Sequence, residues 1–174
     1  MDNDNLHLPI KMLEQRFRSV MVRLPALLGN EAINFILDNF KKQGFMGASF
    51  TPWQKRKNPN KWGQAPKRNG RAILVDTGKY RRSWRIVRMT NDTTVIGSDD
   101  PKAETHQNGL RIGQIQKVES FERKGVGKTK QTVKAHTRRI NQNIPKRPVI
   151  GDSPYLRARL VRIINSEILK AVRR

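Results

Sequence analysis

Few side chains in this sequence could perform acid–base chemistry at neutral pH. The three histidines are His7, His106 and His136. A histidine acts as a general acid or base only where a reacting group lies within hydrogen-bonding distance. His106 has Glu104 close by in the sequence, but no nucleophile pattern accompanies the pair. We therefore expect His106 to cap or pack beside a sheet, and we predict that the protein is not an enzyme.

Two further motifs could handle phosphate chemistry. Asp99 and Asp100 are adjacent, but neighbouring residues of a strand point to opposite faces and seldom share a metal ion. Residues 125–128, "GVGK", resemble a fragment of a phosphate-binding loop but lack its full spacing and strand-to-helix setting, which favours a hairpin tip. The absence of cysteine excludes thiolate chemistry and disulfide bonds. The sequence predicts no cofactor, no metal site and no nuclease centre.

Positive charge is the strongest chemical signal. The 174 residues include 36 Lys+Arg against 14 Asp+Glu, a formal net charge of +22. Residues 111–147 hold eleven of the cations against two acids, Glu119 and Glu122. Such a balance favours contact with a polyanion or an acidic protein surface. The sequence has no DNA-reading helix, aromatic RNA-binding motif or zinc finger, so we do not expect bases to be read.

The cations fall into two groups, one around Tyr80 and Trp84 and one in a long segment further along the chain. We predict that these residues contact a partner protein or DNA: Lys79, Arg81, Arg82, Arg85, Arg123, Lys124, Lys128, Lys130, Lys134, Arg138 and Arg139.

Helices at both ends are expected to position these groups. Apolar residues at helical spacing predict helices over residues 9–24 and 31–43, separated by Pro25 and Gly29. Residues 45–72 are rich in Gly, Pro and Lys without periodicity, which indicates a long loop that Trp53 and Trp62 pin to the core. Towards the C-terminus, Ser153 is a suitable N-cap and Pro154 a suitable first residue for a final helix.

A small antiparallel sheet is expected between the helices. Residues 83–89 and 94–98 alternate around the turn "TNDTT" and predict a hairpin, whereas residues 73–75 fit either a strand or a turn. A short helical turn should follow and stop at Gly109. Residues 111–143 alternate on both sides of "KGVGK" and predict a second, protruding basic hairpin, which we call the arm.

The predicted fold class is therefore α+β: two N-terminal helices, a small antiparallel sheet with the long basic arm, and a C-terminal helix. The length fits one domain spanning residues 1–174. The N-terminus lacks the pattern of a signal peptide. No run of consecutive apolar residues approaches the roughly 20 that span a bilayer, so we expect no membrane association.

Several short motifs resemble, in order, the virion morphogenesis family of tailed phages. This is the Mu-type capsid-assembly and tail-completion group, which is similar to lambdoid neck proteins. The motifs are "FKKQGF", "ILVDTGKYRRSW", "VIGS", "AETHQNG" and "IPKRPVIGDS". Tyr80, Asn108 and Val149-Ile150 depart from the family pattern. The matching positions with an expected structural role are Gly78, Ser83, His106, Gly109, Pro145, Arg147 and Pro148.

The resemblance implies a non-enzymatic structural protein of the virion, located at the neck or tail junction and assembled in the cytoplasm of the bacterial host. It implies a homo-oligomeric ring, for which a hexamer would suit the symmetry, that joins the head connector to the tail. The implied partners are portal or adaptor proteins and tail-tube or tail-terminator proteins, with DNA in the lumen as another partner for the cations. The alternative is a non-sequence-specific DNA-binding accessory protein in packaging or nucleoid organisation.

The proline-rich stretch before the last helix requires an explanation of its own. Prolines fix backbone angles and cannot continue a helix, so Pro145 and Pro148 can hold the final helix at a set angle. Arg147, between them, can direct its guanidinium at a carboxylate or a backbone carbonyl. The sequence leaves open whether this stretch is an internal clamp or a subunit contact.

Overall fold

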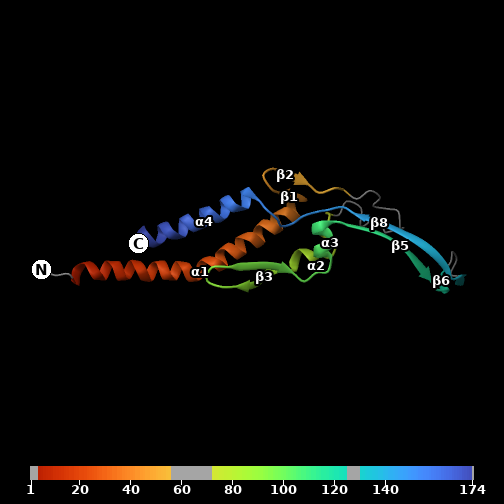
Figure 1. Ribbon diagram of the computed structural model, residues 1–174, viewed down its shortest axis with the longest axis horizontal. Coiled ribbons are helices and arrows are strands. Elements are labelled where there is room, and N and C mark those ends of the chain that lie inside the picture. Colours follow the sequence, from red (N-terminus) through yellow and green to blue (C-terminus); the bar gives the residue numbers. More distant parts are fainter. Residues whose placement is uncertain (1–3, 56–71, 125–129, 174) are drawn as a thin grey trace.

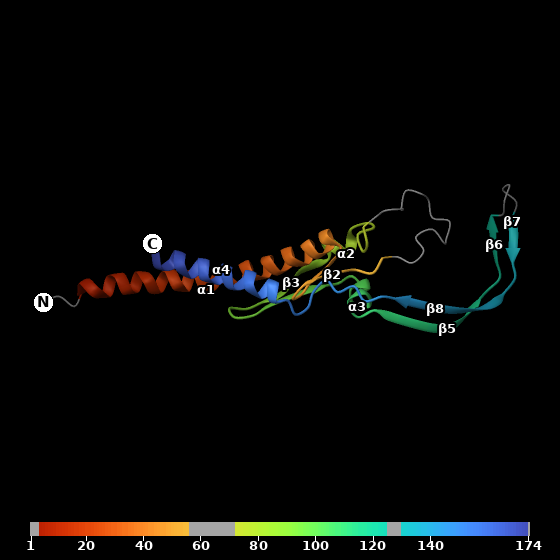
Figure 2. The same cartoon turned by 90° about the horizontal axis from the view of Figure 1, so that it is seen from above.

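The chain folds into an elongated α+β molecule, which confirms the predicted fold class (Figure 1). The computed structural model describes residues 4–55, 72–124 and 130–173. Helices gather at one end and a two-stranded ribbon projects from the other, as Figure 2 also shows. In chain order the elements are α1 (Asp4–Lys42), β1 (Gly44–Met46), β2 (Phe50–Pro52), α2 (Lys79–Arg82), β3 (Trp84–Met89), β4 (Thr94–Ser98), α3 (Lys102–Asn108), β5 (Leu110–Val118), β6 (Phe121–Lys124), β7 (Lys130–Val133), β8 (His136–Ile144) and α4 (Pro154–Arg173).

α1 is a single helix of 39 residues, about 58 Å long at 1.5 Å per residue. The sequence predicted two helices because Pro25 and Gly29 both weaken an isolated helix. Instead the helix continues through them and changes direction between its halves (Figure 1), as an internal proline causes.

The β3–β4 hairpin packs against α1 near Pro25 and Gly29. Thr94 donates to the carbonyl oxygen of Pro25 at 3.0 Å, and a Cβ on Gly29 would lie 2.7 Å from Cδ1 of Ile86. Tertiary packing therefore overrides the helix breakers.

α4 lies alongside α1 (Figures 1 and 2). Its predicted N-cap is confirmed, because the N–H of Leu156 donates to Oγ of Ser153 at 3.0 Å. Nearer the C-terminus, Nη2 of Arg23 on α1 lies 2.8 Å from Oε2 of Glu167, whose residue is buried. These contacts fix both ends of the helix pair.

Part of the stretch predicted as a long loop, residues 45–72, is a small antiparallel hairpin made by β1 and β2. Strands of three residues are too short to give a periodic signal in the sequence. Trp53 follows β2, is 5% exposed and donates from Nε1 to the carbonyl oxygen of Pro148 at 2.9 Å, so it pins this segment as predicted. Residues 56–71, which include Trp62, lie outside the described residues.

The middle of the chain follows the sequence prediction. β3 and β4 form the expected antiparallel hairpin, with a turn in which the N–H of Thr90 donates to the carbonyl oxygen of Thr93 at 2.8 Å. Residues 73–77 form turns rather than a strand. α3 ends at Gly109, whose φ is 76°. A Cβ there would lie 3.1 Å from the carbonyl oxygen of Ile144, so glycine allows α3 to approach the end of the arm closely.

The predicted arm, residues 111–143, is present and bends along its length. β5 pairs antiparallel with β8, and β6 pairs antiparallel with β7. Residues 119–120 and 134–135 separate the two pairs, and the ribbon turns at this point (Figure 2). Residues 125–129, predicted as the tip, lie outside the described residues.

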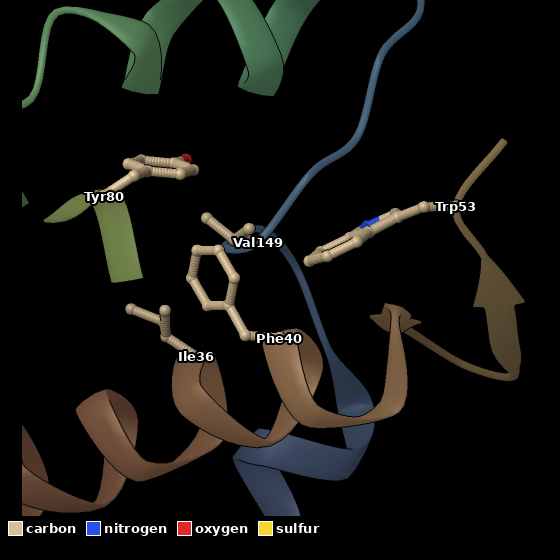
Figure 3. Close-up of a cluster of buried hydrophobic side chains, with 5 residues drawn as sticks. All are labelled: Ile36, Phe40, Trp53, Tyr80 and Val149. Atoms are coloured by element: carbon tan, nitrogen blue, oxygen red, sulfur yellow. The ribbon is translucent and has the colours of Figure 1, made fainter. Parts of the chain in front are cut away.

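The hydrophobic core lies where α1, the end of β2, α2 and the chain before α4 meet (Figure 3). The ring of Phe40 is edge-on to Trp53 and to Tyr80, with centroids 5.6 Å and 5.3 Å apart. Such pairs contribute roughly 0.5–1.5 kcal/mol beyond their buried area. Ile36 and Val149 are fully buried in the same cluster. The core therefore joins segments from both ends of the chain and leaves the arm outside.

Within the described residues, one helical stretch, Pro9–Lys42, is long and apolar enough to cross a membrane. Charged residues interrupt the apolar runs of this helix, so it has no long stretch of consecutive apolar residues. Core helices of soluble proteins pass the same test, and 33% of the window is buried in this structure. The expectation of no membrane association stays a prediction.

Candidate docking arm and the clamp at its root

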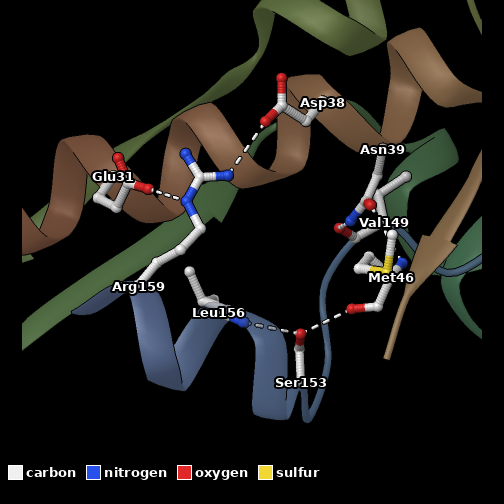
Figure 4. A network of polar contacts seen from close by, with 8 residues as sticks. All are labelled: Glu31, Asp38, Asn39, Met46, Val149, Ser153, Leu156 and Arg159. Atoms are coloured by element: carbon white, nitrogen blue, oxygen red, sulfur yellow. Dashed lines mark hydrogen bonds and ion pairs between the residues drawn. The ribbon is translucent and has the colours of Figure 1, made fainter. Parts of the chain in front are cut away.

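Residues 145–153, which we call the clamp segment, connect β8 to α4 and are held by buried polar groups. Asn39 on α1 is 1% exposed; its amide donates to the carbonyl oxygen of Val149 at 3.1 Å and accepts from the N–H of Met46 at 3.2 Å (Figure 4). Ser153 donates to the carbonyl oxygen of Met46 at 2.6 Å. A buried polar group left unpaired is costly, so these bonds define where the segment lies.

Arg147 ties the clamp segment to the chain that follows β2. It is 7% exposed, and its Nε and Nη2 donate to the carbonyl oxygen of Gln54 at 3.1 Å and 2.9 Å. The guanidinium therefore reaches a backbone carbonyl, one of the two targets that the sequence suggested. The flanking Pro145 and Pro148 keep this stretch out of helical geometry.

α3 holds the clamp segment from the other side. Gln107 donates to the carbonyl oxygen of Ile150 at 2.5 Å and accepts from the N–H of Val149 at 3.1 Å. The N–H of Arg147 donates to the carbonyl oxygen of His106 at 2.7 Å. The prolines, Arg147 and α3 thus act as an internal clamp at the root of the arm.

Arg159 fixes the angle of α4 against α1. Its side chain is 23% exposed and pairs with Glu31 and with Asp38, whose Oδ2 lies 3.2 Å from Nη1 (Figure 4). Both carboxylates come from α1. One guanidinium that bridges two turns of the facing helix restricts both sliding and rotation, because its planar donors have fixed directions.

His106 is half-buried beside Tyr80, with ring centroids 6.0 Å apart. Burial lowers the pKa of His106, and the positive charges of Arg147 and Lys102 lower it further, while Asp100 opposes them. Burial, with a contribution from Asp100, raises the pKa of Tyr80 to about 12. Within the described residues, Nδ1 of His106 and the hydroxyl of Tyr80 are buried without a hydrogen-bond partner. His106 on α3 therefore packs against α2, and its expected place beside the sheet stays a prediction.

Gly78 and Ser83 bracket α2. Gly78 has φ 75°, where any side chain would be strained, and a Cβ would lie 2.5 Å from Nη1 of Arg82. Ser83 donates to the carbonyl oxygen of Tyr80 at 2.7 Å, and its Oγ lies 2.5 Å from Oγ of Ser98 on β4. These two family-motif positions are thus structural, and they orient the cations that lie between them.

The first cation group lies on the body of the molecule. Lys79, Arg81 and Arg82 are on α2 and are exposed. Nη2 of Arg82 donates to a nearby backbone carbonyl at 3.1 Å. Arg85 on β3 pairs with Asp99, with 2.9 Å between Nη1 and Oδ2, so its charge is partly neutralised.

The second cation group lies on the arm, and Figures 1 and 2 show that the two groups are not brought together. Arg123 and Arg138 donate to the neutral amides of glutamines across the ribbon, at 3.1 Å and 2.9 Å. Lys130 lies 3.2 Å from a carboxylate oxygen of Glu122. Lys134 and Arg139 are also exposed. The predicted contact residue Lys128 and the side chain of Lys124 lie outside the described residues. The contact role of the whole group stays a prediction.

The register of β5 and β8 gives the ribbon two different faces, because residues directly opposite each other share a face. One face carries mostly aliphatic and amide side chains with a single arginine: Leu110, Ile112, Gln114, Gln116, Val118, His136, Arg138, Ile140, Gln142 and Ile144. The other carries three cations and no acid: Arg111, Gly113, Ile115, Lys117, Thr137, Arg139, Asn141 and Asn143. Ile115, on the cationic face, is 75% exposed.

Sequence reasoning missed the amides that hold the clamp segment, Asn39 and Gln107. Asn39 reaches a carbonyl 110 positions away, and Gln107 one 43 positions away. Nothing local marks such partners, although Gln107 stands inside the motif "AETHQNG". Within the described residues, no group of three His, Asp or Glu side chains could hold a metal ion.

A model of the phage virion morphogenesis family matches residues 26–169. The match begins within α1 and ends within α4, so it covers the clamp segment and the whole arm. No curated protein and no solved structure shows significant similarity to the chain.

Proposed function

Because the chain belongs to the phage virion morphogenesis family, we propose that it is a non-enzymatic structural protein of the phage head–tail junction. Family membership gives it a role in phage assembly. Beyond that, we propose that several copies form a ring that joins the head connector to the tail. A hexamer would fit such a junction, because oligomers of identical chains adopt closed symmetry.

The observation that carries this proposal is the arm. An isolated two-stranded ribbon is marginally stable in water, yet this one extends from the core. The aliphatic side chains of one face are only partly buried, since Leu110 is 38% exposed and Ile112 and Ile140 are half-buried. Among the described strands, β5 and β8 pair only with each other, so both edges present free backbone groups. Such edges readily pair with another chain. We propose that the arm lies on a sheet edge of a neighbouring copy, which covers these groups and links the ring.

The charge of the chain suggests what the cations face. Copies with a formal charge of +22 repel one another, so the contacts between copies should use the aliphatic face. The cationic face is then free for acidic surfaces of portal, adaptor, tail-tube or tail-terminator proteins, or for DNA in the lumen. A ring multiplies weak contacts from each copy into a stable attachment.

The test changes Lys128, Lys130, Arg138 and Arg139 together to glutamate. We expect the chain to fold as before, while heads and tails accumulate separately in electron micrographs of lysates. The matched control changes two lysines and two arginines of the body, Lys11, Lys41, Arg88 and Arg162, to glutamate and should leave joining intact. Fully infectious particles carrying the arm variant would disprove the role of the arm.

A DNA-binding accessory protein is the second candidate, favoured by the acid-free face that holds Arg111, Lys117 and Arg139. It requires that the isolated protein bind duplex DNA with an affinity that falls steeply with salt. It also requires that purified virions lack the chain. Copurification of the chain with intact virions favours the junction role.

A further inference from the structure

A pocket lies at the root of the arm, between the segment after β2, the end of α3 and the two arm strands where they leave the body. Its volume is about 860 Å³, within the range of pockets that take small ligands or short peptide segments. Gly109 forms part of its wall, at the place where the absence of a side chain lets α3 approach the arm. The pocket therefore lies directly beside the contact between α3 and the end of β8.

The charge of the pocket is one-sided. Four of its lining residues are cations, namely Lys55, Arg111, Lys146 and Arg147, and none of the lining residues is an acid. Three of the cations are exposed, whereas Arg147 is buried at the wall by its bonds to a backbone carbonyl. Like charges around a concave surface raise the local positive potential, because low-dielectric walls concentrate the field. Such a site attracts an anion.

The remaining lining residues indicate what kind of anion fits. Leu110 and Pro145 give the pocket apolar surface, and Gln54, Asn108 and Asn143 add amide groups that both donate and accept hydrogen bonds. Amides of this kind pair well with a peptide backbone, and the apolar surface suits aliphatic side chains. Arg111 can bind a carboxylate through two parallel hydrogen bonds. This combination suits a peptide better than a free phosphate.

Duplex DNA is the less suitable occupant. A double helix is a broad rod that can lie across the exposed cations of the arm, but it cannot enter a concave pocket. We propose that the pocket at the arm root binds an acidic, partly apolar peptide segment of a partner protein. This inference rests on the proposed function only in assuming that such a partner exists in the particle.

His106 lines the pocket and can report on its occupancy. Its pKa is lowered by burial and by the charges of Arg147 and Lys102, with Asp100 acting in the opposite direction. A carboxylate bound in the pocket would offset the two positive charges. The pKa of His106, followed by NMR, should therefore rise when a peptide binds.

The experiment measures binding of a fluorescein-labelled peptide of alternating glutamate and leucine to the purified full chain. The pocket variant combines K55Q, R111Q and K146Q. The matched control combines K11Q, K41Q and R88Q, which removes the same number of lysines and arginines from exposed positions of the body, outside both the pocket and the arm. We expect at least a tenfold loss of affinity in the pocket variant, less than a twofold loss in the control, and weak binding of the peptide with glutamine in place of glutamate.

Three outcomes would overturn the proposal: equal losses in both variants, a His106 pKa unchanged by the peptide, or competition by inorganic phosphate as strong as that of the peptide at equal ionic strength. A duplex DNA probe bound in preference to the peptide would point to the arm cations instead. None of these results depends on ring formation, so failure here is distinct from failure of the junction role. Circular dichroism of both variants checks that they fold.

Discussion

Two regions of the chain differ in how they are held. The core, which surrounds the clamp segment, is held by buried side chains, whereas the arm is largely exposed. In the core, Phe40 and Val149 are at most 1% exposed, and buried amides hold the backbone. On the arm, Phe121 is 47% exposed and Ile115 is 75% exposed, and the polar contacts are between solvated side chains. The comparison indicates that the core carries the stability of the fold, whereas the arm leaves apolar side chains exposed, as the proposed docking role requires.

The largest contrast is expected for matched phenylalanines. Phe40→Ala removes two edge-on aromatic contacts from the core and should lower the free energy of unfolding by roughly 3–5 kcal/mol. Phe121→Ala on the arm removes a half-exposed ring and should cost under about 1 kcal/mol. Urea denaturation followed by circular dichroism measures both. Equal losses would show that the arm contributes to the stability of the isolated chain as much as the core does.

A smaller contrast is expected for matched arginines. Arg147→Met removes the donors to Gln54 and should cost roughly 1–3 kcal/mol, because two hydrogen bonds from a buried charged group are lost. Arg139→Met changes an exposed arm residue and should change stability by no more than about 0.5 kcal/mol. Thermal unfolding of both variants compares them. If Arg147→Met proved as stable as the wild type, the clamp would not depend on its guanidinium.

The smallest contrast concerns the response to pH. Because the pKa of His106 in the fold lies below the ordinary 6.5, the unfolded chain binds more protons between these two values. The contribution of neutral His106 to the free energy of unfolding should therefore be fully present above pH 6.5. It should be lost as the pH falls through the pKa that His106 has in the fold. His106→Gln should flatten this decline, whereas His136→Gln on the exposed arm should leave it as in the wild type. Urea midpoints at pH 7.5, 6.5 and 5.5 measure it, and an unchanged slope in His106→Gln would contradict the assignment.

Local features of the fold could be predicted from the sequence, because their signals are local. The β3–β4 hairpin, α3 with its end at Gly109, and the cap of α4 at Ser153 follow from periodicity, turn residues and capping. The continuous α1 could not be predicted, because what carries it past Pro25 is packing against β3 and β4. The β1–β2 hairpin was missed because its strands are too short to show alternation.

The same division holds for the candidate site. The cations of the arm were visible as a charge imbalance, and Arg147 as an arginine between prolines. The amides Asn39 and Gln107 were not, because their partners lie far away in the sequence. The pocket at the arm root was invisible as well, since Lys55, Arg111 and Lys146 are brought together only by the fold.

Imaging of the intact virion at the head–tail junction by electron cryo-microscopy tests the central claim most directly. The account predicts a ring of copies of this chain, in which each arm contacts a neighbouring copy through its aliphatic face and an acidic partner or DNA through its cationic face. Purified particles that lack the chain would contradict the account, as would a ring whose arms project into solvent without touching another molecule.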